Sequence, residues 1–355
     1  MIPTAQSETP VSSTAQAGVE LDALLRGAGV SRLQQMGWIR VTGDDRVRWL
    51  NGMVTNSVQQ LGPGEGAYNF LLNVQGRIQG DGVIYAEADA LWIETAAPQV
   101  AGMLKMLDHF IIMDDVELSD GSGEWAGLLV AGPQSAALLE KVGIAIAEGN
   151  PLERRAVALR GGDVSVVRAY SPLVPRFEIW TREGGEAMAK IFEALLSAGA
   201  VACGAESFEW LRILEGTPLY GTDIRDRELP QETGQTRALH FAKGCYLGQE
   251  IVERIRSRGN VHRIFGGFRL EGDLPAPGAV LEADGKPVGE LTSVTAMPLP
   301  DGPTVQLALG YVRREALERG TPLVYAGGVA APVSLPFMST AASRLRAASE
   351  PSERV

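Results

Sequence analysis

The sequence predicts an α+β protein of two or three domains that ends in a small antiparallel β-barrel. The 355 residues exceed what one hydrophobic core usually supports. Up to about residue 260, short alternating apolar runs are mixed with amphipathic helical patterns, which favours strands and helices within the same domains. After that point, short strands are broken by glycine and proline, a texture typical of a small antiparallel barrel.

Composition and charge exclude several classes of protein. Hydrophobic residues make 45% of the chain and charged residues 21%, which is the profile of an ordinary globular protein. The formal charge of -11 disfavours a general surface for nucleic acid or for anionic membranes. No apolar run reaches the roughly 18 residues of a membrane span, and the first residues lack the basic start and apolar stretch of a secretory signal. We therefore expect no membrane and no direct nucleic-acid partner.

The cysteine and histidine content indicates the compartment and the metal chemistry. Cys203 and Cys245 are far apart in sequence, and the chain has three histidines and no CxxC pair. Two separated cysteines fit a reducing compartment better than a disulfide framework, so the cytoplasm is the expected location. The same pattern predicts no zinc or iron–sulfur site held by this chain alone.

The expected elements follow from periodicity and turn residues. We expect residues 1–18 to form a disordered tail and residues 339–355 to form a flexible one. Both segments are polar and contain few apolar side chains that a core could bury. Strands are expected at 37–41, 68–73, 78–85, 91–94, 116–118, 126–130, 164–170 and 177–180. Helices are expected at 46–50, 99–110, 136–142, 183–198 and 206–215. Barrel strands are expected at 264–270, 279–281, 285–296, 306–312, 321–325 and 329–335, with a tight turn at Asp284-Gly285.

The stretch Lys-Gly-Cys-Tyr-Leu-Gly-Gln-Glu, residues 243–250, introduces a further helix. Leu247, Ile251 and Ile255 recur every four residues and share one helical face, and Gly259 is placed to end it. Cys245 then lies just before a helix N-terminus and two residues from Lys243. Both features would stabilise a thiolate and lower the pKa of the thiol. The alternative is that Cys245 packs as a small hydrophobic residue.

The run KGCYLGQEIVERIRSRGNVHR resembles the signature of the YgfZ family of folate-binding proteins. That family is related to the glycine cleavage T-protein, an aminomethyltransferase that uses tetrahydrofolate and usually lacks the cysteine. The likeness extends from about Arg32 to Met338. It implies a three-lobed fold in which residues 19–260 form two lobes interleaved in sequence around a central folate funnel. Residues 261–338 would form the C-terminal barrel.

The resemblance also assigns candidate residues. Glu178 matches a Gly-Phe-Glu-Ile element whose glutamate grips the pterin, a role that suits a carboxylate facing adjacent donors. The alternative is a solvated strand residue. Arg176 stands where the family has the glycine of that element, so access to the pterin could differ.

Asp81 matches one of two adjacent acids of the T-protein, one of them essential for catalysis. The other position is Gly80, which weakens the aminomethyltransferase reading. A turn or edge role for Asp81 is the alternative.

Three more residues complete the predicted site. Arg212 would face the funnel and pair with a carboxylate such as a glutamyl group of folate, or it forms an ion pair with Glu209 or Glu215. Lys243 would lower the pKa of the Cys245 thiol or meet an anionic tail, or it is a surface charge. Tyr246 would stack on a flat ligand or serve as a core aromatic.

The resemblance implies a role in making or repairing iron–sulfur enzymes, using tetrahydrofolate or a one-carbon derivative. Partners would be those enzymes or their assembly proteins, and Cys245 would act on a partner's sulfur or cluster, or on a folate-borne carbon. Whether the protein is an enzyme stays open. The alternatives are an aminomethyltransferase of the glycine cleavage system and a non-catalytic folate-binding adaptor.

Overall fold

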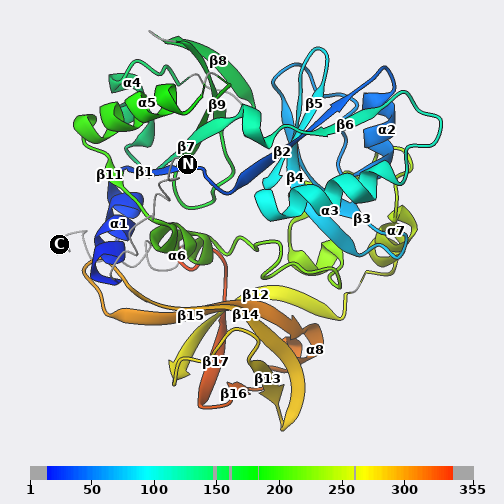
Figure 1. Cartoon of the computed structure of the whole chain (residues 1–355). Helices are drawn as coiled ribbons and strands as arrows, with labels where there is room; N and C mark the ends of the chain where they lie inside the picture. Colours follow the sequence, from blue (N-terminus) through cyan, green and yellow to red (C-terminus); the bar gives the residue numbers. More distant parts are fainter. Residues whose placement is uncertain (1–13, 147–149, 160–161, 183, 260, 339–355) are drawn as a thin grey trace, which may run out of the picture.

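The computed structural model describes residues 14–146, 150–159, 162–182, 184–259 and 261–338. The described chain forms two sheets flanked by helices and a closed barrel, which lies below the sheets in Figure 1. The first sheet is antiparallel, and the second is antiparallel except for the parallel pairing of β1 (Gly29–Arg32) with β11 (Val201–Ala202). The predicted α+β class and C-terminal barrel are confirmed. The predicted C-terminal tail, 339–355, lies outside the described residues. Within the described residues, no helix is long and apolar enough to cross a bilayer.

The predicted N-terminal tail is wrong at its inner end. Helix α1 (Thr14–Arg26) begins inside it. Ala17 and Leu21 are fully buried in a cluster that contains Trp210 and the barrel residue Leu309. The segment looked polar because only one side of its helix is apolar, and that side packs where the second sheet, α6 and the barrel meet. Residues 1–13 lie outside the described part of the chain.

The first sheet has five strands in the order β3-β4-β5-β2-β6. Its outer face packs on α2 and α3, where Ile39 and Ile93 meet Val100 and Met103. The β3–β4 hairpin turns at Gly76, whose φ of +72° suits glycine. The bounds are β2 (Met36–Thr42), α2 (Arg46–Met53), β3 (Gly66–Leu72), β4 (Ile78–Ala86), β5 (Leu91–Ala96), α3 (Ala97–Asp108) and β6 (Glu117–Asp120).

The second sheet has six strands in the order β11-β1-β7-β10-β9-β8. The chain enters it with β1, leaves to build the first sheet, and returns with β7. Its outer face packs on α4 and α5 through residues such as Phe177, Ile179, Met188 and Leu195. The bounds are β1 (Gly29–Arg32), β7 (Ala126–Ala131), α4 (Ser135–Lys141), β8 (Arg154–Leu159), β9 (Gly162–Arg168), β10 (Arg176–Thr181), α5 (Gly185–Ala198), β11 (Val201–Ala202) and α6 (Ala205–Glu215).

The barrel closes in the order β12-β15-β14-β13-β16-β17 around Phe268, Leu291 and Leu323. Its β13–β14 hairpin pairs Ala283 with Lys286. Asp284 and Gly285 both have positive φ, at 50° and 70°, as a two-residue turn requires. The bounds are β12 (Arg263–Gly272), β13 (Val280–Ala283), β14 (Lys286–Pro298), β15 (Thr304–Arg313), α8 (Arg314–Arg319), β16 (Leu323–Tyr325) and β17 (Gly328–Val333).

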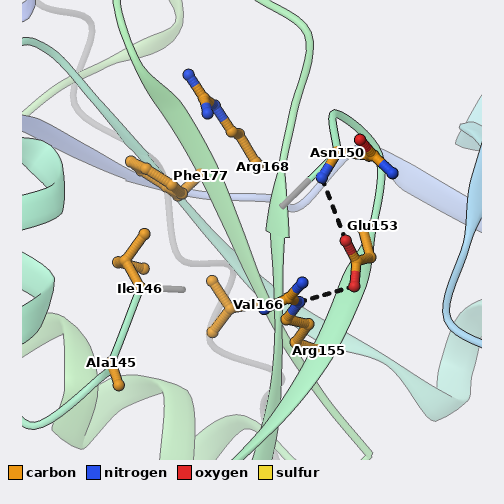
Figure 2. A pocket seen from close by; sticks show the side chains of 8 residues that line it. All are labelled: Ala145, Ile146, Asn150, Glu153, Arg155, Val166, Arg168 and Phe177. Atoms are coloured by element: carbon orange, nitrogen blue, oxygen red, sulfur yellow. Dashed lines mark hydrogen bonds and ion pairs between the residues drawn. The ribbon is translucent and has the colours of Figure 1, made fainter. Parts of the chain in front are cut away.

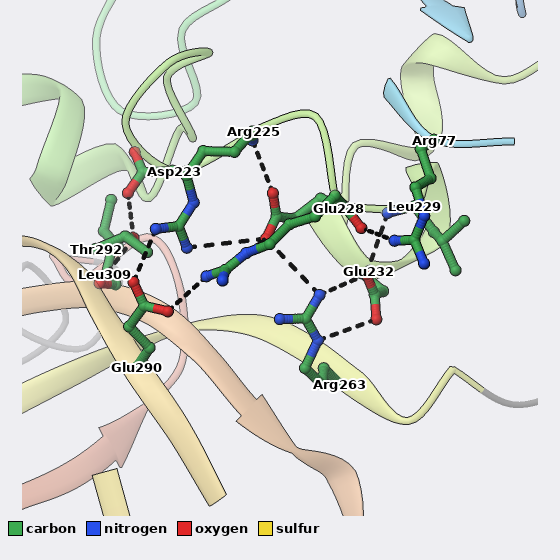
Figure 3. A network of polar contacts seen from close by, with 11 residues as sticks. Arg77, Asp223, Arg225, Glu228, Leu229, Glu232, Arg263, Glu290, Thr292 and Leu309 are labelled. Carbon is green, nitrogen blue, oxygen red and sulfur yellow. Dashed lines mark hydrogen bonds and ion pairs between the residues drawn. The ribbon is translucent and has the colours of Figure 1, made fainter. Parts of the chain in front are cut away.

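A charged segment, residues 217–233, joins the sheets to the barrel (Figure 3). The side chain of Glu228 is fully buried and accepts hydrogen bonds from the backbone N–H of Arg225 at 2.8 Å and from Nε of Arg227 at 3.1 Å. Both arginines also reach Glu290 on β14, at 2.8 and 2.5 Å. The carbonyl of Glu228 accepts the N–H of Ile78 on β4 at 3.0 Å. One buried residue therefore connects the first sheet with the barrel.

A second ion pair strengthens the same junction. Arg263, the first residue of β12, donates to both carboxylate oxygens of Glu232, at 3.3 and 3.1 Å. Glu232 lies in the short helix η2 (Pro230–Thr233), and Arg263 also lies 3.7 Å from Glu228. Three arginines thus surround one fully buried carboxylate.

Glu228→Gln should lower the free energy of unfolding by about 3 to 5 kcal/mol, because it leaves three partly buried arginines without their shared anion. Denaturant unfolding checks this, with Glu186→Gln as the control. Glu186 is exposed and pairs with Lys190 on α5, so its loss should change stability by less than about 1 kcal/mol. Equal shifts for the two variants would contradict the role of Glu228.

Candidate functional site

The inner face of the first sheet carries a row of polar and aromatic side chains. Asp81, Val83 and Tyr85 alternate along β4 and point to one face. Val83 is directly opposite Tyr68 on β3 and Glu94 on β5. Directly opposed residues share a face, so these side chains lie together. The opposite face of the sheet is the one covered by α2 and α3.

The inner face of the second sheet meets this row. Arg176, Glu178 and Trp180 alternate along β10, whereas Phe177 points to the outer core under α5. Burial and, next, the negative charge of Glu178 contribute to raising the pKa of Glu94, so β5 and β10 lie close to each other across the gap between the sheets. We call Tyr68, Asp81, Glu94, Arg176 and Glu178 the inter-sheet site.

An aromatic cluster closes one end of this interface. Trp38 stacks on Trp125 with ring centroids 4.7 Å apart and meets Trp180 edge-on at 5.0 Å. Trp92 and Tyr85 complete the cluster. Trp38, Trp92 and Tyr85 belong to the first sheet, whereas Trp180 belongs to β10 of the second. The aromatic packing therefore holds the two sheets together beside the site.

Glu178 is 6% exposed and holds two partners within its own strand. Arg176 Nη2 donates to one carboxylate oxygen at 3.1 Å and Trp180 Nε1 to the other at 3.3 Å. In the part of the chain that the structure describes, the buried Nε of Arg176 has no hydrogen-bond partner. A buried donor next to a buried carboxylate is costly unless a ligand pairs with it.

Glu94 faces Glu178 as a second buried carboxyl group, 4% exposed. Burial, and next the negative charge of Glu178, raise the pKa of Glu94 well above its usual value. The two groups also share a hydrogen bond, and the Tyr85 hydroxyl bonds to Glu94. The raised pKa favours the neutral acid at Glu94, which avoids two like charges in a dry interface.

Asp81 is held at the other end of the site. Its carboxylate accepts the Tyr68 hydroxyl at 2.6 Å and the Gln99 side chain at 2.8 Å, and burial raises its pKa. At Gly80 a Cβ atom would stand 3.0 Å from Cγ of Met103. A side chain at position 80 would therefore point toward helix α3 and would require Met103 to shift. Asp81 is a partly buried, hydrogen-bonded residue of the interior strand β4 and not a turn residue.

Arg212 is committed to contacts within the protein. Its guanidinium donates to both carboxylate oxygens of Glu209, to Asp223, to the carbonyl of Thr217 and to Ser293 of β14, all within 2.8 Å. These bonds use all five N–H groups that an arginine has. The ion-pair alternative with Glu209 is thus the arrangement seen, and we assign no donor of Arg212 to folate.

Lys243 and Tyr246 both attach the cysteine motif to the first lobe. The Lys243 ammonium donates to the carbonyls of Asn51, Val54 and Asn56, each at 2.7 Å, which uses its three N–H groups. Burial lowers the pKa of Lys243 to about 8. Tyr246 is 8% exposed and belongs to the core cluster with Phe70. We therefore assign Lys243 the role of anchoring its motif on the first lobe, in place of the predicted role beside the Cys245 thiol.

Cys245 is exposed on the surface, whereas Cys203 is buried. Helix α7 (Gln249–Arg258) begins four residues after Cys245, with Gly248 and Gly259 at its two ends in left-handed backbone. Burial raises the pKa of Cys203 to about 12. The functional role of Cys245 stays a prediction, and its accessibility agrees with that role.

Sequence patterns did not indicate three residues of the site region: Glu94, Tyr170 and Arg237. Arg237 lies in the short helix η3 (Thr236–Ala238) and stacks on the rings of Tyr68 and Tyr170, 4.0 and 3.9 Å from their centroids. These neighbours are brought together by pairing between distant segments, and none of them alternates or clusters in a way that marks chemistry.

A surface pocket lies on the opposite face of β10 (Figure 2). It is lined by Phe177, whose side chain points away from Glu178, and by Ile146 and Val166. The ion pair of Glu153 with Arg155 closes one side. The backbone N–H of Asn150 also donates to Glu153, and Arg168 completes the polar part of the lining.

Comparison with known proteins agrees with this geometry. Residues 1–243 match the GCVT N-terminal domain, and residues 263–340 match the C-terminal β-barrel domain of CAF17. The aminomethyltransferase of Geobacillus kaustophilus is 30% identical over 288 residues, which covers 79% of this chain and 78% of that protein. A chloroplastic protein of Arabidopsis thaliana, named as a transferase, is 26% identical over 322 residues, or 90% and 73%.

A solved structure has the same fold. The glycine cleavage system aminomethyltransferase T of Bartonella henselae superimposes with a TM-score of 0.79 at 23% identity, covering 92% of this chain and 91% of that one. The family matches together span nearly the whole chain, with the lobes and the barrel in the same order as in the structure. The chain therefore belongs to the YgfZ/CAF17 family within the GCVT, or T-protein, superfamily.

Proposed function

We propose that the inter-sheet site binds the pterin of tetrahydrofolate or of a one-carbon derivative, with Glu178 as its main acceptor. The observation that carries this proposal is the buried Glu178 carboxylate beside a buried Arg176 Nε without a partner among the described residues. A pterin edge offers adjacent N–H donors and a carbonyl oxygen. The carboxylate can accept the donors, and Arg176 can donate to the oxygen.

The chain's own residues would then position the folate and manage protons. When bound, the folate supplies a carrier for a one-carbon unit. Asp81 lies on the same sheet face as Glu94, and burial raises its pKa, so it can hold or accept a proton near neutral pH more readily than a solvated aspartate. The aromatic cluster keeps water from one end of the site.

We further propose that the protein supports the assembly or repair of iron–sulfur enzymes in the cytoplasm, with Cys245 as the residue that acts at the surface. Three features support this. The Lys-Gly-Cys-Tyr motif and the CAF17-type barrel are those of the family. The thiol is exposed. The motif is anchored on the first lobe by Lys243 and by Leu247, whose N–H donates to Gly52 at 2.9 Å.

The second candidate is an aminomethyltransferase, because relatives at 30% identity carry that name. Gly80 counts against it: the second acid is absent from the sequence, and a side chain at this position would crowd Met103. We therefore rank folate binding without glycine cleavage first.

Glu178→Gln should weaken the binding of tetrahydrofolate by about 1 to 3 kcal/mol, because an amide NH2 would face pterin donors in a buried site. Isothermal titration calorimetry measures this, with Glu193→Gln on the exposed side of α5 as the matched control. No binding by the wild type, or the same Kd for the Glu178 variant, would overturn the assignment.

Glycine-cleavage activity should be at least about a hundredfold below that of an authentic T-protein, the cost of losing one acid–base group. The measurement is tetrahydrofolate-dependent ammonia release from the aminomethyl-lipoyl carrier, run beside the Geobacillus kaustophilus enzyme. Turnover of similar magnitude would favour the aminomethyltransferase candidate instead.

Alkylation of the native protein with iodoacetamide at pH 8 should modify Cys245 and spare Cys203. Cys245 is exposed, whereas burial holds Cys203 as a thiol with a pKa of about 12. Peptide mass mapping before and after denaturation separates the two sites. Equal alkylation rates of the two thiols in the native protein, or labelling of Cys245 only after unfolding, would mean that Cys245 is a packing residue.

Cys245→Ser should leave tetrahydrofolate binding within about twofold of the wild type and should abolish support of iron–sulfur enzymes in a complementation test. Cys245 is exposed, and substitutions at such surface positions usually change stability little. Cys203→Ala is the matched control and should complement. Full complementation by the Cys245 variant would refute its functional role.

A further inference from the structure

The backbone at residues 237–238 is fixed on the first lobe by side-chain hydrogen bonds from Thr55 and Asn56. The Asn56 side-chain amide donates to the carbonyls of both Tyr68 and Arg237, at 3.1 and 3.0 Å. The Thr55 hydroxyl donates to the carbonyl of Ala238 at 2.6 Å. Asn56 and Thr55 follow α2 directly, in the segment whose carbonyls hold Lys243. The same segment therefore anchors both Arg237 and the motif that contains Cys245.

The guanidinium of Arg237 is held flat but is incompletely hydrogen-bonded. It stacks on Tyr68 and Tyr170, and its Nε donates to Gln235 at 3.1 Å. In the described part of the chain, its two terminal nitrogens have no hydrogen bond, and no carboxylate lies within ion-pair distance. Arg212 is the internal comparison, because all its N–H groups are engaged.

The surroundings leave this positive charge uncompensated. Asp81 lies near enough to interact with Arg237, but its oxygens already accept Tyr68 and Gln99. Arg176 adds a second positive charge nearby. Burial lowers the pKa of Arg237, although a guanidinium stays charged at every physiological pH. Arg237 is partly buried and has no partner ion among the described residues, so a bound anion would supply the missing negative charge.

We propose that Arg237 is the receptor for a carboxylate group, bound through N–H groups of the two terminal nitrogens at the edge of its stacked guanidinium. A planar fork held between aromatic rings is pre-organised for bidentate binding of a carboxylate. Tyr170 is 40% exposed, so a ligand can approach from that side. The carboxylate comes either from the glutamyl tail of the folate or from a separate small acid bound beside it, and this step rests on the proposed folate function only in the first case.

The experiment compares the wild type with Arg237→Gln and Arg237→Lys. The control is Arg256→Gln, because Arg256 also stacks on an aromatic ring, that of Phe241, but is half exposed and pairs with Glu253. Calorimetry measures the binding of tetrahydrofolate and of 6-methyltetrahydropterin, which has no tail. Nuclear magnetic resonance titration at constant ionic strength measures the binding of acetate, with and without bound 6-methyltetrahydropterin.

If the tail is the ligand, Arg237→Gln should weaken tetrahydrofolate by about tenfold or more, the value of a charged hydrogen-bonded pair, and leave 6-methyltetrahydropterin unchanged. If a separate acid is the ligand, both pterins should bind as in the wild type, and acetate binding should be lost. Arg237→Lys keeps the positive charge but not the planar guanidinium, so its loss of ligand affinity should be intermediate. If Arg237→Gln does not fold, the lysine variant alone tests whether Arg237 binds the carboxylate.

The proposal is overturned if neither tetrahydrofolate nor acetate binding depends on Arg237, or if Arg256→Gln has the same effect. Failure of the pterin site is a separate outcome. In that case the wild type binds no 6-methyltetrahydropterin, while the acetate titration of the pterin-free protein still tests Arg237.

Discussion

The geometry of this protein depends on the buried carboxylate of Glu228. Three arginines from the 217–233 segment and the barrel converge on it, and its backbone carbonyl holds the first residue of β4. β4 carries Asp81, and the chain that leaves the segment carries Arg237 and Cys245. A buried charge satisfied by partners on several elements has few alternative arrangements. The same residue thus fixes the barrel against the sheets and sets the register of the candidate site.

The interface between the sheets has two parts, an aromatic end that packs the sheets together and a polar end that forms the proposed ligand site. Its aromatic end, with Trp38 stacked on Trp125, contributes apolar area that holds two sheets of different parts of the chain together. Its polar end contains Glu178 and Glu94, which are buried, and Asp81, which is partly buried, all at a cost in solvation. Packing of the aromatic end compensates for this cost, so carboxylates can stay where water is scarce. Such carboxylates distinguish ligand donors more sharply than solvated ones do.

Local patterns predicted most elements, because their signals lie within a few residues. The turn at Asp284-Gly285 and the end of α7 at Gly259 are examples, since both need positive φ. Strand β1 was missed because its four residues do not alternate and it forms through pairing with β7 and β11. Motif matches located Glu178 and Asp81 in the sequence. They could not reveal Glu94 or Arg237, whose neighbours come from distant strands, or the Glu209 and Asp223 contacts that occupy Arg212.

The most direct test of this account is a crystal structure of the complex with tetrahydrofolate. The account predicts a pterin between β10 and the first sheet, its N–H edge on the carboxylate of Glu178 and its carbonyl oxygen near Nε of Arg176. A pterin bound elsewhere, such as in the surface pocket beside Phe177 or on the barrel, would contradict it. So would a bound pterin that leaves the Nε of Arg176 without a partner.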